Sequence, residues 1–381
     1  MRTLFVDVGQ GTCQIILLGR GRAIVIDAGT HPSVPQRILR LNRIHTIELL
    51  AISHSHHDHS GGAVRKKRKT KKSGPLLTGL LADYQDKVKQ IGFVQDSEFK
   101  KSNFAKFIKK LINENKLSWN QLVRLEITDR PRPLWPIDGN DNSVTLVSCI
   151  SPTAFDSTRA YLENDVNGSS AIVQLRHKDD ALLFTGDSEY AQWRTLHEIN
   201  NQTKLRCKGM SMPHHGGLME GDQSDLDWFC NEVVETEVVV FSFGTINGYK
   251  HPRPEVISAM RQAGATVVCT QMTDQCCTDL EGVRPGAIGS LIHPCRSSTK
   301  TDLVKPRKKQ SKATKKISAI PRSRNVACAG TISALLTDDG IEFEKLDLHQ
   351  AGVDKLKANG CSPLCRLSEV PDLSDQRSAL A

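Results

Sequence analysis

The chain has 381 residues, of which 38% are hydrophobic and 24% are charged, and its formal net charge is +9. This apolar content is enough for a packed core, so a wholly disordered chain is excluded. No apolar run reaches the roughly 18 residues of a membrane-spanning helix, and no secretory signal fits the first residues. We therefore expect a cytoplasmic protein that is not integral to a membrane.

Strands and turns alternate over the first fifty residues. Three apolar runs predict strands, over residues 3–8, 14–18 and 23–26. The last two flank Gly19-Arg20-Gly21, which indicates a hairpin. Residues 34–41 have helical spacing, and residues 47–52, apolar except for Glu48, predict a buried strand. This order indicates a sheet with a helix packed on one face.

A histidine-rich sequence follows the predicted strand 47–52. It reads Ser53-His54-Ser55-His56-His57-Asp58-His59-Ser60-Gly61-Gly62, and it fits H-x-H-x-D-H. Imidazoles at positions i and i+2 of extended chain point the same way, so His54 and His56 can share one ion. Asp58 and His59 then face a second ion. The motif predicts a metal site at a strand end, and the alternative is a histidine-rich loop without metal.

A basic run begins six residues after His59 and therefore lies near the mouth of the predicted metal site. Its members are Arg65, Lys66, Lys67, Arg68, Lys69, Lys71 and Lys72. Such a run attracts a polyanion and makes its binding depend steeply on salt. Few aromatic residues are interleaved, which favours contacts with a nucleic-acid backbone over base stacking. The alternative is a solvated loop without a partner.

Residues 63–133 are expected to form an insertion or lid, with apolar residues at helical spacing between Phe104 and Ile112. Strand character then returns, and one further helix and a C-terminal hairpin are expected. The predicted strands are residues 143–150, 171–175, 181–184, 238–243 and 265–270, the helix is 256–263, and the hairpin joins 331–336 to 341–346.

Two later groups complete a metal site of this kind. Thr185-Gly186-Asp187 places an aspartate at the exit of a predicted strand, where its carboxylate can bridge two ions. Met212-Pro213-His214-His215-Gly216-Gly217 also leaves a short apolar stretch and offers a ligand. Each motif alone is compatible with an ordinary turn, but their order after the first motif favours a shared site.

The ordered motifs resemble those of metallo-β-lactamase-fold hydrolases. More narrowly, they resemble the soluble domain of the bacterial DNA-uptake protein ComEC and its stand-alone relatives. The resemblance covers roughly residues 3–290, with 63–133 matching poorly. Its segments are Phe5-Val6-Asp7-Val8-Gly9-Gln10-Gly11, Ile26-Asp27-Ala28-Gly29, the His54 motif, Asn167-Gly168-Ser169-Ser170, Leu183-Phe184-Thr185-Gly186-Asp187, Pro213-His214-His215-Gly216 and Tyr249-Lys250-His251-Pro252.

This resemblance implies an α+β fold, an αββα sandwich, with two divalent ions of zinc or manganese. In the family pattern His54 and His56 bind the first ion, and Asp187 bridges the two. The ligands that the pattern assigns to the second ion are Asp58, His59 and His214. Because two such ions activate a water, an ionised Asp58 is a candidate to orient it. His251 is a candidate to protonate the leaving group or hold a phosphate oxygen, unless it is a loop histidine without a role.

Two positions depart from the wider superfamily. A further histidine for the first ion is usual, but His177 is the only one between His59 and Asp187, and it lies in a polar turn. Oxygen groups such as Asp165 or Asn167, or water, are expected instead, which leans toward manganese. Thr12 occupies a position at which relatives often carry an acidic residue, so the role of Thr12 stays open.

The C-terminal third carries a second basic segment and most of a cysteine group. Residues 300–324 hold ten basic residues and one acid, and with the first run removed as well, the charge of +9 becomes −7. Cysteines 269, 276, 277, 295 and 328 flank this segment, and disulfides are not expected in this compartment. A structural zinc on Cys276 or Cys277 with Cys295 and Cys328 is one interpretation. Cys361 and Cys365 are weaker candidates, and free buried thiols or redox pairing are the alternatives.

We expect a metallo-β-lactamase-fold domain over residues 1–296, a basic segment at 297–325, and a closing hairpin and tail at 326–381. The leading hypothesis is a two-metal phosphodiesterase or nuclease acting on DNA. The first alternative is a hydrolase of a small molecule such as a cyclic nucleotide, thioester or lactone. The second is a non-catalytic nucleic-acid-binding module.

Overall fold

The computed structural model describes nine ranges of the chain. They are residues 1–66, 77–125, 131–137, 142–148, 166–245, 248–277, 327–344, 346–358 and 363–365. Several expectations lie outside them: most of the first basic run, the basic segment 297–325, Asp165, Cys295, Cys361 and the tail beyond residue 365.

An eight-stranded sheet is built from the N-terminal third of the chain and the C-terminal hairpin, in the order β17-β16-β1-β2-β3-β4-β7-β8. Antiparallel pairing joins β16, β1, β2 and β3, whereas β3, β4, β7 and β8 are parallel. The strands are β1 (Arg2–Phe5), β2 (Gln14–Gly19), β3 (Arg22–Ile26), β4 (Thr46–Ile52), β7 (Val88–Phe93), β8 (Leu122–Arg124), β16 (Ile332–Thr337) and β17 (Gly340–Glu344).

A seven-stranded sheet follows in the order β15-β14-β13-β12-β11-β10-β9, and β12 to β15 within it are parallel. A separate pair, β5 (Arg65–Lys66) and β6 (Leu77–Thr78), stands beside the first sheet. The strands of the second sheet are β9 (Arg132–Ile137), β10 (Asn142–Ser148), β11 (Ile172–His177), β12 (Asp180–Phe184), β13 (Leu205–Ser211), β14 (Val234–Phe241) and β15 (Thr266–Cys269).

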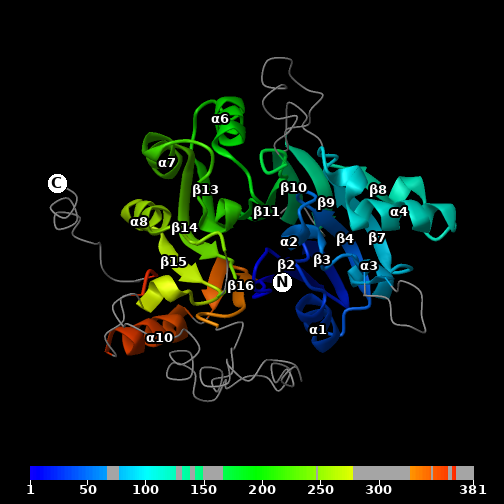
Figure 1. Ribbon diagram of the computed structural model, residues 1–381, viewed down its shortest axis with the longest axis horizontal. Coiled ribbons are helices and arrows are strands. Elements are labelled where there is room, and N and C mark those ends of the chain that lie inside the picture. The colour runs from blue at the N-terminus through cyan, green and yellow to red at the C-terminus, as the bar shows by residue number, and fades with distance from the viewer. Residues whose placement is uncertain are drawn as a thin grey trace, which may run out of the picture.

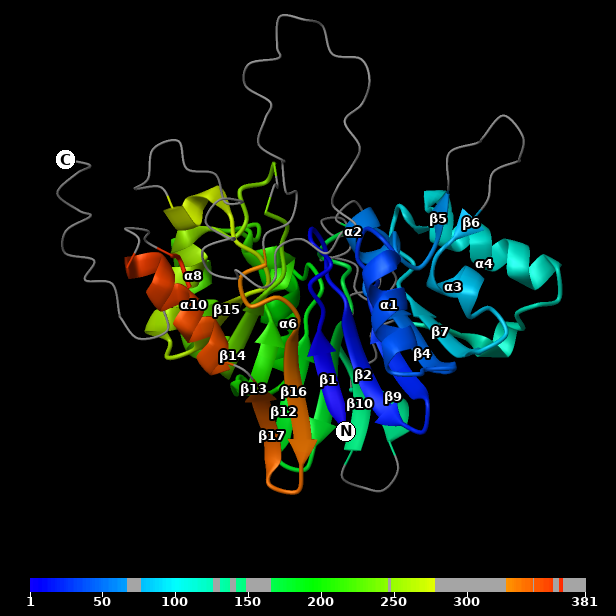
Figure 2. The ribbon, with the colours of Figure 1, turned by 90° about the horizontal axis from the view of Figure 1, so that it is seen from below.

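Helices cover the outer faces of both sheets, so the chain forms the expected αββα sandwich (Figures 1 and 2). On the first sheet lie α1 (Ser33–Leu41), α3 (Leu80–Asp83) and α4 (Asn103–Asn113), and the short α2 (His57–Ser60) caps its edge. On the second sheet lie α6 (Tyr190–Ile199), α7 (Gln223–Trp228), α8 (Pro254–Gln262) and α10 (Leu346–Ala358). Short helical turns are η1 (Phe99–Lys101), η2 (Trp119–Gln121), η3 (Pro213–Gly216), η4 (Phe229–Val233) and η5 (Asp274–Cys277).

Alternation along the strands builds the core between the sheets. Ile16 and Ile24 face the second sheet, whereas their neighbours Ile15 and Val25 pack beneath the helices. Both faces of these strands are therefore buried, which is why they read as unbroken apolar runs in the sequence.

The stretch expected as an insertion, 63–133, is built into both sheets. Its β7 pairs in parallel with β4, and β8 pairs with β7. The apolar face of α4 packs into the core of the first helical layer through Phe104, Phe107 and Leu111. The stretch thus extends the first sheet, and its last residues begin β9 of the second.

The C-terminal hairpin is also part of the sandwich. Strand β16 pairs with β1, with Arg2 opposite Leu335 and Phe5 opposite Ile332, and Figure 2 shows the two strands side by side. The first and last strands of the chain therefore complete one sheet. Among the described ranges, no helix has both the length and the apolar character that a membrane crossing requires.

Candidate metal centre

Parallel strands of both sheets end at the same edge, and their carboxyl ends carry the predicted ligands. His54, His56, Asp58 and His59 follow β4, Asp187 follows β12, and the two histidines of η3 follow β13. Loops at this edge of open α/β sheets commonly form binding sites, because adjacent strand ends converge there.

Two clusters of donor atoms meet at Asp187. One cluster holds His54, His56 and Asp187, and the other holds Asp58, His59 and His215. The Asp187 carboxylate faces both: its Oδ2 lies 3.7 Å from Nε2 of His54, and its Oδ1 lies 3.0 Å from Nε2 of His59. Nε2 of His215 is 3.4 Å from Asp187 Oδ1 and 3.4 Å from Asp58 Oδ2. This geometry is that of a carboxylate placed between two ion sites.

Outer partners hold the imidazoles by the nitrogen that faces away from the clusters. Nδ1 of His59 donates to Oδ2 of Asp27 at 2.7 Å, and Nδ1 of His215 donates to the Ser242 carbonyl at 2.8 Å. Nδ1 of His54 lies 3.2 Å from the Ser53 hydroxyl. Such contacts fix the tautomer and leave the Nε2 lone pair for a metal.

The donor set fits divalent ions. Nε2 of His54, His59 and His215 and Oδ1 of Asp187 are buried and make no hydrogen bond of good geometry. Buried polar atoms rarely remain in this state unless something else satisfies them. Imidazole and carboxylate donors converging in this way are typical of zinc and related transition metals.

The charges point to the same conclusion. Burial would raise the pKa of Asp187, but His59 and His215 bring it well below its ordinary range. Burial would lower the pKa of His59, but Asp187 and Asp27 raise it well above its ordinary value. The buried carboxylates thus stay ionised beside a protonated His59, and a divalent ion bound at its Nε2 would take the place of that proton.

Asp27 is a buried brace that the sequence did not identify as part of the site. Its carboxylate accepts hydrogen bonds from the backbone and hydroxyl of Ser53 at 2.7 and 2.8 Å and from the Thr12 hydroxyl at 2.8 Å, in addition to His59. Burial opposes ionisation, but the charge and hydrogen bond of His59 hold the pKa of Asp27 below its ordinary value. Thr12 therefore contacts Asp27 and His59 from behind the ligands.

A second brace, Asp96, comes from the loop after β7. Its carboxylate accepts from the backbone N–H of Ser55 at 2.7 Å and from its hydroxyl at 2.5 Å. Ser55 stands between His54 and His56, so Asp96 fixes the segment that presents both. The stretch 63–133 thus contributes to the metal centre through this residue.

His214 and His215 have different surroundings. The family pattern assigns His214 to the second cluster, but the structure places His215 there instead. Both residues have positive φ, 50° and 56°, so the chain turns sharply and adjacent side chains diverge. The His214 ring is partly exposed, with its Nδ1 3.1 Å from Oε1 of Glu189.

His251 lies at the rim of the second cluster. Its ring is 5.4 Å from that of His214 and 6.2 Å from that of His215, and it stacks on Tyr249. Burial, with the nearby His215 and His214, lowers the pKa of His251 to about 4. The loop is held against η3, since the backbone N–H of Arg253 donates to the Gly216 carbonyl at 2.8 Å.

The Asn167–Ser170 segment lies behind the first cluster. The Ser170 hydroxyl is 3.1 Å from Nδ1 of His54 and accepts from the Asp187 backbone N–H at 3.1 Å. His177 is remote, because it ends β11 and its Nε2 bonds to the Thr337 carbonyl at 2.6 Å. Within the described ranges, the first cluster is therefore His54, His56 and Asp187.

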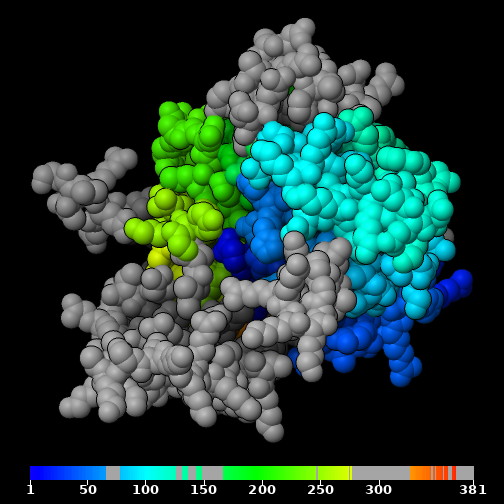
Figure 3. Space-filling model, turned by 45° about the vertical axis from the view of Figure 1, so that its right-hand side comes forward, coloured from blue at the N-terminus to red at the C-terminus, as the bar shows by residue number. Residues whose placement is uncertain are grey.

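Arg65 is the residue of the basic run whose side chain the structure describes. It lines a cavity of about 540 Å³ together with Gln10, His31 and His57, next to α2. The N-terminal loop at this cavity reaches the molecular surface between the two halves of the molecule, as the dark blue atoms of Figure 3 show. The other described run residue, Lys66, follows in β5, and Lys67, Arg68, Lys69, Lys71 and Lys72 lie outside the described ranges.

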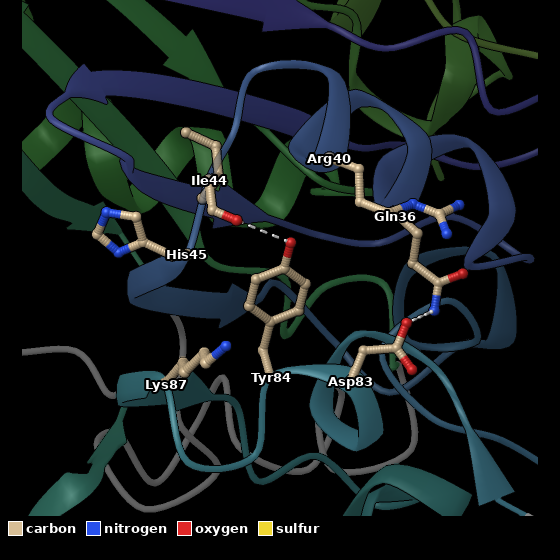
Figure 4. Close-up of a pocket in the computed structure, with 7 residues that line it drawn as sticks. All are labelled: Gln36, Arg40, Ile44, His45, Asp83, Tyr84 and Lys87. Carbon is tan, nitrogen blue, oxygen red and sulfur yellow. Dashed lines mark hydrogen bonds between the residues drawn. The ribbon is translucent and has the colours of Figure 1, made fainter.

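A second pocket lies away from the metal centre, between α1 and α3 (Figure 4). The Tyr84 hydroxyl donates to the Ile44 carbonyl at 3.1 Å, and the Gln36 amide donates to Asp83 at 2.5 Å. His45 in its wall precedes β4, whereas His54 follows that strand. This pocket therefore sits at the opposite end of the strands from the ligands.

The cysteines expected to bind zinc are brought together in part. Cys276 and Cys328 are buried in one cluster that also contains Cys269, Cys365 and His349. The Cys277 side chain and Cys295 lie outside what the structure describes.

Comparison with known proteins connects this arrangement to a family. A profile of the metallo-beta-lactamase superfamily matches residues 6–203. No curated protein is significantly similar to the chain.

Among solved structures, the chain is similar to the metallo-beta-lactamase fold protein YhfI from Bacillus subtilis. The identity is 10% and the TM-score 0.40, over 71% of this chain and 96% of that one. It is similar to human tRNase Z, short form, at 12% identity and a TM-score of 0.36, over 72% of this chain and 94% of that one. It is also similar to zinc-bound PqqB from Methylobacterium extorquens, at 10% identity and a TM-score of 0.41, over 71% of this chain and 98% of that one. Structural similarity at this level gives no information about the activity of the chain.

Proposed function

Because the chain belongs to the metallo-beta-lactamase superfamily of metal-dependent hydrolases, we propose that it is a phosphodiesterase that cleaves DNA. The observation that carries the proposal is the basic run that starts at Arg65, six residues after His59. Arg65 lines the cavity beside α2, the helix that contains Asp58 and His59. A small neutral substrate gains nothing from seven adjacent cations, whereas a phosphate backbone does. The choice of DNA rests on the motif series, which resembles that of the ComEC group.

The two clusters would hold two divalent ions, with His54, His56 and Asp187 at the first and Asp58, His59 and His215 at the second. When bound, such ions supply Lewis-acid activation of water and stabilise charge on phosphate oxygens. Zinc and manganese both fit the imidazole and carboxylate donors.

The chain's own residues then position the reactants. Burial opposes the ionised form of Asp58, but the neighbouring His215 and the charge of His59 hold its pKa well below its ordinary range. An ionised Asp58 can accept a hydrogen bond from the attacking water and orient it. His251, at the rim, can hold a phosphate oxygen through a ring N–H, and Asp27 and Asp96 keep the ligand segment rigid.

The test is a cleavage assay on the full-length protein with zinc, manganese or magnesium. The substrates are single- and double-stranded DNA, RNA and a small phosphodiester. We expect metal-dependent cleavage of DNA and none by an Asp187→Ala protein, since this carboxylate faces both clusters. A metal-loaded protein that cleaves no phosphodiester with any of these ions would refute the proposal.

Neutralising the basic run distinguishes two hypotheses, one with DNA and the other with a small molecule as the substrate. With the seven basic residues of 65–72 replaced by serine, we expect DNA cleavage at physiological salt to fall at least about tenfold. Turnover of the small phosphodiester should stay unchanged, because the run supplies no ligand. Unchanged cleavage of DNA would instead favour a small-molecule hydrolase. DNA binding without cleavage by the wild type would favour a non-catalytic binding module.

A further inference from the structure

A second group of metal-binding side chains lies buried beyond the end of β15, outside the metal centre. Cys328, His349 and Cys365 place one donor atom each within 4.8 Å of one another. The Cys328 and Cys365 sulfurs are 3.9 Å apart, and Nε2 of His349 is 3.3 Å from the first and 3.5 Å from the second. All three side chains are buried.

These separations match the edges of a zinc tetrahedron. With Zn–S bonds of about 2.3 Å and a Zn–N bond of about 2.0 Å, tetrahedral angles require S···S of about 3.8 Å and S···N of about 3.5 Å. The observed distances of 3.9, 3.3 and 3.5 Å agree within a few tenths of an ångström. Free cysteines that only fill a core have no reason to surround an imidazole nitrogen in this way.

Cys276, in the same core cluster, is the candidate for the fourth donor. It is buried, and the backbone amides of Thr273 and Leu364 hydrogen-bond to its sulfur. Burial raises the pKa of the Cys276 thiol to about 11. The amide donors act in the opposite direction and would stabilise a metal-bound thiolate. The Cys269 thiol hydrogen-bonds to Cys365 and so helps to hold the Cys365 side chain in place.

We propose that Cys276, Cys328, His349 and Cys365 hold one structural zinc ion. Three cysteines and one histidine form a closed ligand set that leaves no open position for a substrate, which is typical of structural rather than catalytic sites. Cys276 and Cys328 belong to the set expected from the sequence, Cys365 was a weaker candidate there, and His349 is new. Neither the Cys277 side chain nor Cys295 falls within the described part of the chain.

The zinc would fasten the C-terminal elements to the second sheet. Cys276 belongs to η5 after β15, His349 to α10, and Cys365 to the last described segment. Cys276 and Cys328 also stand near the two ends of the stretch 278–326, which contains the second basic segment. One ion therefore anchors both ends of that stretch and the final helix at a single point.

Zinc X-ray absorption on the purified full-length protein tests the proposal directly. The two clusters of the metal centre contain no cysteine. A zinc–sulfur shell at about 2.3 Å must therefore come from cysteines outside the metal centre, and the variants below assign it to the second group. We expect this shell in the wild type, and we expect it to persist in Asp187→Ala, with three sulfurs and one nitrogen around the remaining ion. Folded, zinc-loaded protein with only nitrogen and oxygen neighbours would overturn the proposal.

Variants provide a second readout that does not use activity. His349→Ala and Cys365→Ser should each lose one equivalent of zinc, whereas Cys230→Ser, a buried free cysteine elsewhere, should retain it. If the first two fail to fold, the wild-type absorption spectrum still decides. An intact mass showing a disulfide between Cys328 and Cys365, with no zinc–sulfur shell, would also overturn the proposal. Failure of the cleavage assay would leave this inference untouched.

Discussion

At the residue scale, the backbone of η3 decides which of two adjacent histidines faces the metal centre. His215 is buried and its Nδ1 donates to the Ser242 carbonyl, which aims Nε2 inward. The partly exposed His214 instead pairs with Glu189. The two side chains are therefore expected to differ sharply in their importance for metal binding.

Replacing each histidine by alanine tests this difference. We expect His215→Ala to weaken binding at the second cluster by at least about 100-fold, because it removes a ligand. His214→Ala serves as the matched control, and both metal equivalents should remain. Metal content and competition titrations measure the outcome. Loss of metal from His214→Ala with retention by His215→Ala would contradict the geometry.

The sequence could predict the ligands whose spacing is local, but not the braces behind them. H-x-H-x-D-H marks His54, His56, Asp58 and His59 because the spacing itself carries the chemistry. Asp27, Asp96 and Ser170 act through contacts between distant segments. The motif series includes the segments of Asp27 and Ser170 without assigning either residue a role, and no motif marks Asp96. The choice between His214 and His215 likewise depends on positive φ angles and on Glu189 and Ser242, which no pattern of residue types expresses.

At the element scale, the short helix α2 is held by backbone contacts rather than by its own length. The Asp58 and His59 carbonyls accept from the amides of Thr12 and Ala28 at 3.3 and 2.8 Å. The loop before Thr12 runs so close that a Cβ on Gly11 would lie 2.1 Å from the Asp58 carbonyl oxygen. Glycine at position 11 is thus required for α2 to present its ligands.

A pair of glycine substitutions separates this close approach from backbone strain. Gly11 and Gly19 both have positive φ, but a Cβ on Gly19 would meet nothing within 4 Å. We expect Gly19→Ala to cost about 1–2 kcal/mol of unfolding free energy from strain alone. Gly11→Ala should cost about 2–5 kcal/mol and also weaken metal binding at the second cluster. Denaturant unfolding and metal titration measure both, and equal effects would disprove the close-contact explanation.

Most strands marked by apolar residues were predictable, whereas two with several charged or amide side chains were missed. Apolar runs marked β2, β3, β4 and β12, because helices cover one face and the other sheet covers the second. Strands β7 and β13 carry lysine, arginine or glutamine among their apolar residues, and the expectations missed them. Helices α6 and α10 were missed as well.

At the scale of the whole molecule, the charge is divided between an acidic body and two basic segments. The first segment starts at the edge of the sandwich where the strands end in ligands, so it should govern binding of a polyanion. Other exposed cations lie at the opposite edge, where parallel strands begin. Arg43 precedes β4, Lys87 precedes β7 and Lys204 precedes β13.

The salt dependence of DNA binding distinguishes the two edges. Replacing the seven basic residues of 65–72 by serine should reduce the slope of log affinity against log salt by up to about 6. The matched control, with Arg43, Lys87 and Lys204 replaced by serine, should leave the slope nearly unchanged. Binding is measured by fluorescence anisotropy with a metal-free protein to prevent cleavage. Similar slopes for the two variants would show that the run does not contact the polymer.

The pairing of β16 with β1 determines when the first sheet can be completed during synthesis on the ribosome. His54, His56, Asp58 and His59 leave the ribosome early, but Asp187 and His215 come from the second half of the chain. The sheet that presents the first four is complete only when residues 332–344 have been made. A chain that ends before residue 187 therefore lacks the bridging carboxylate, and one that ends before residue 332 still lacks an edge of this sheet. Under the proposed function, we do not expect such chains to cleave nucleic acid.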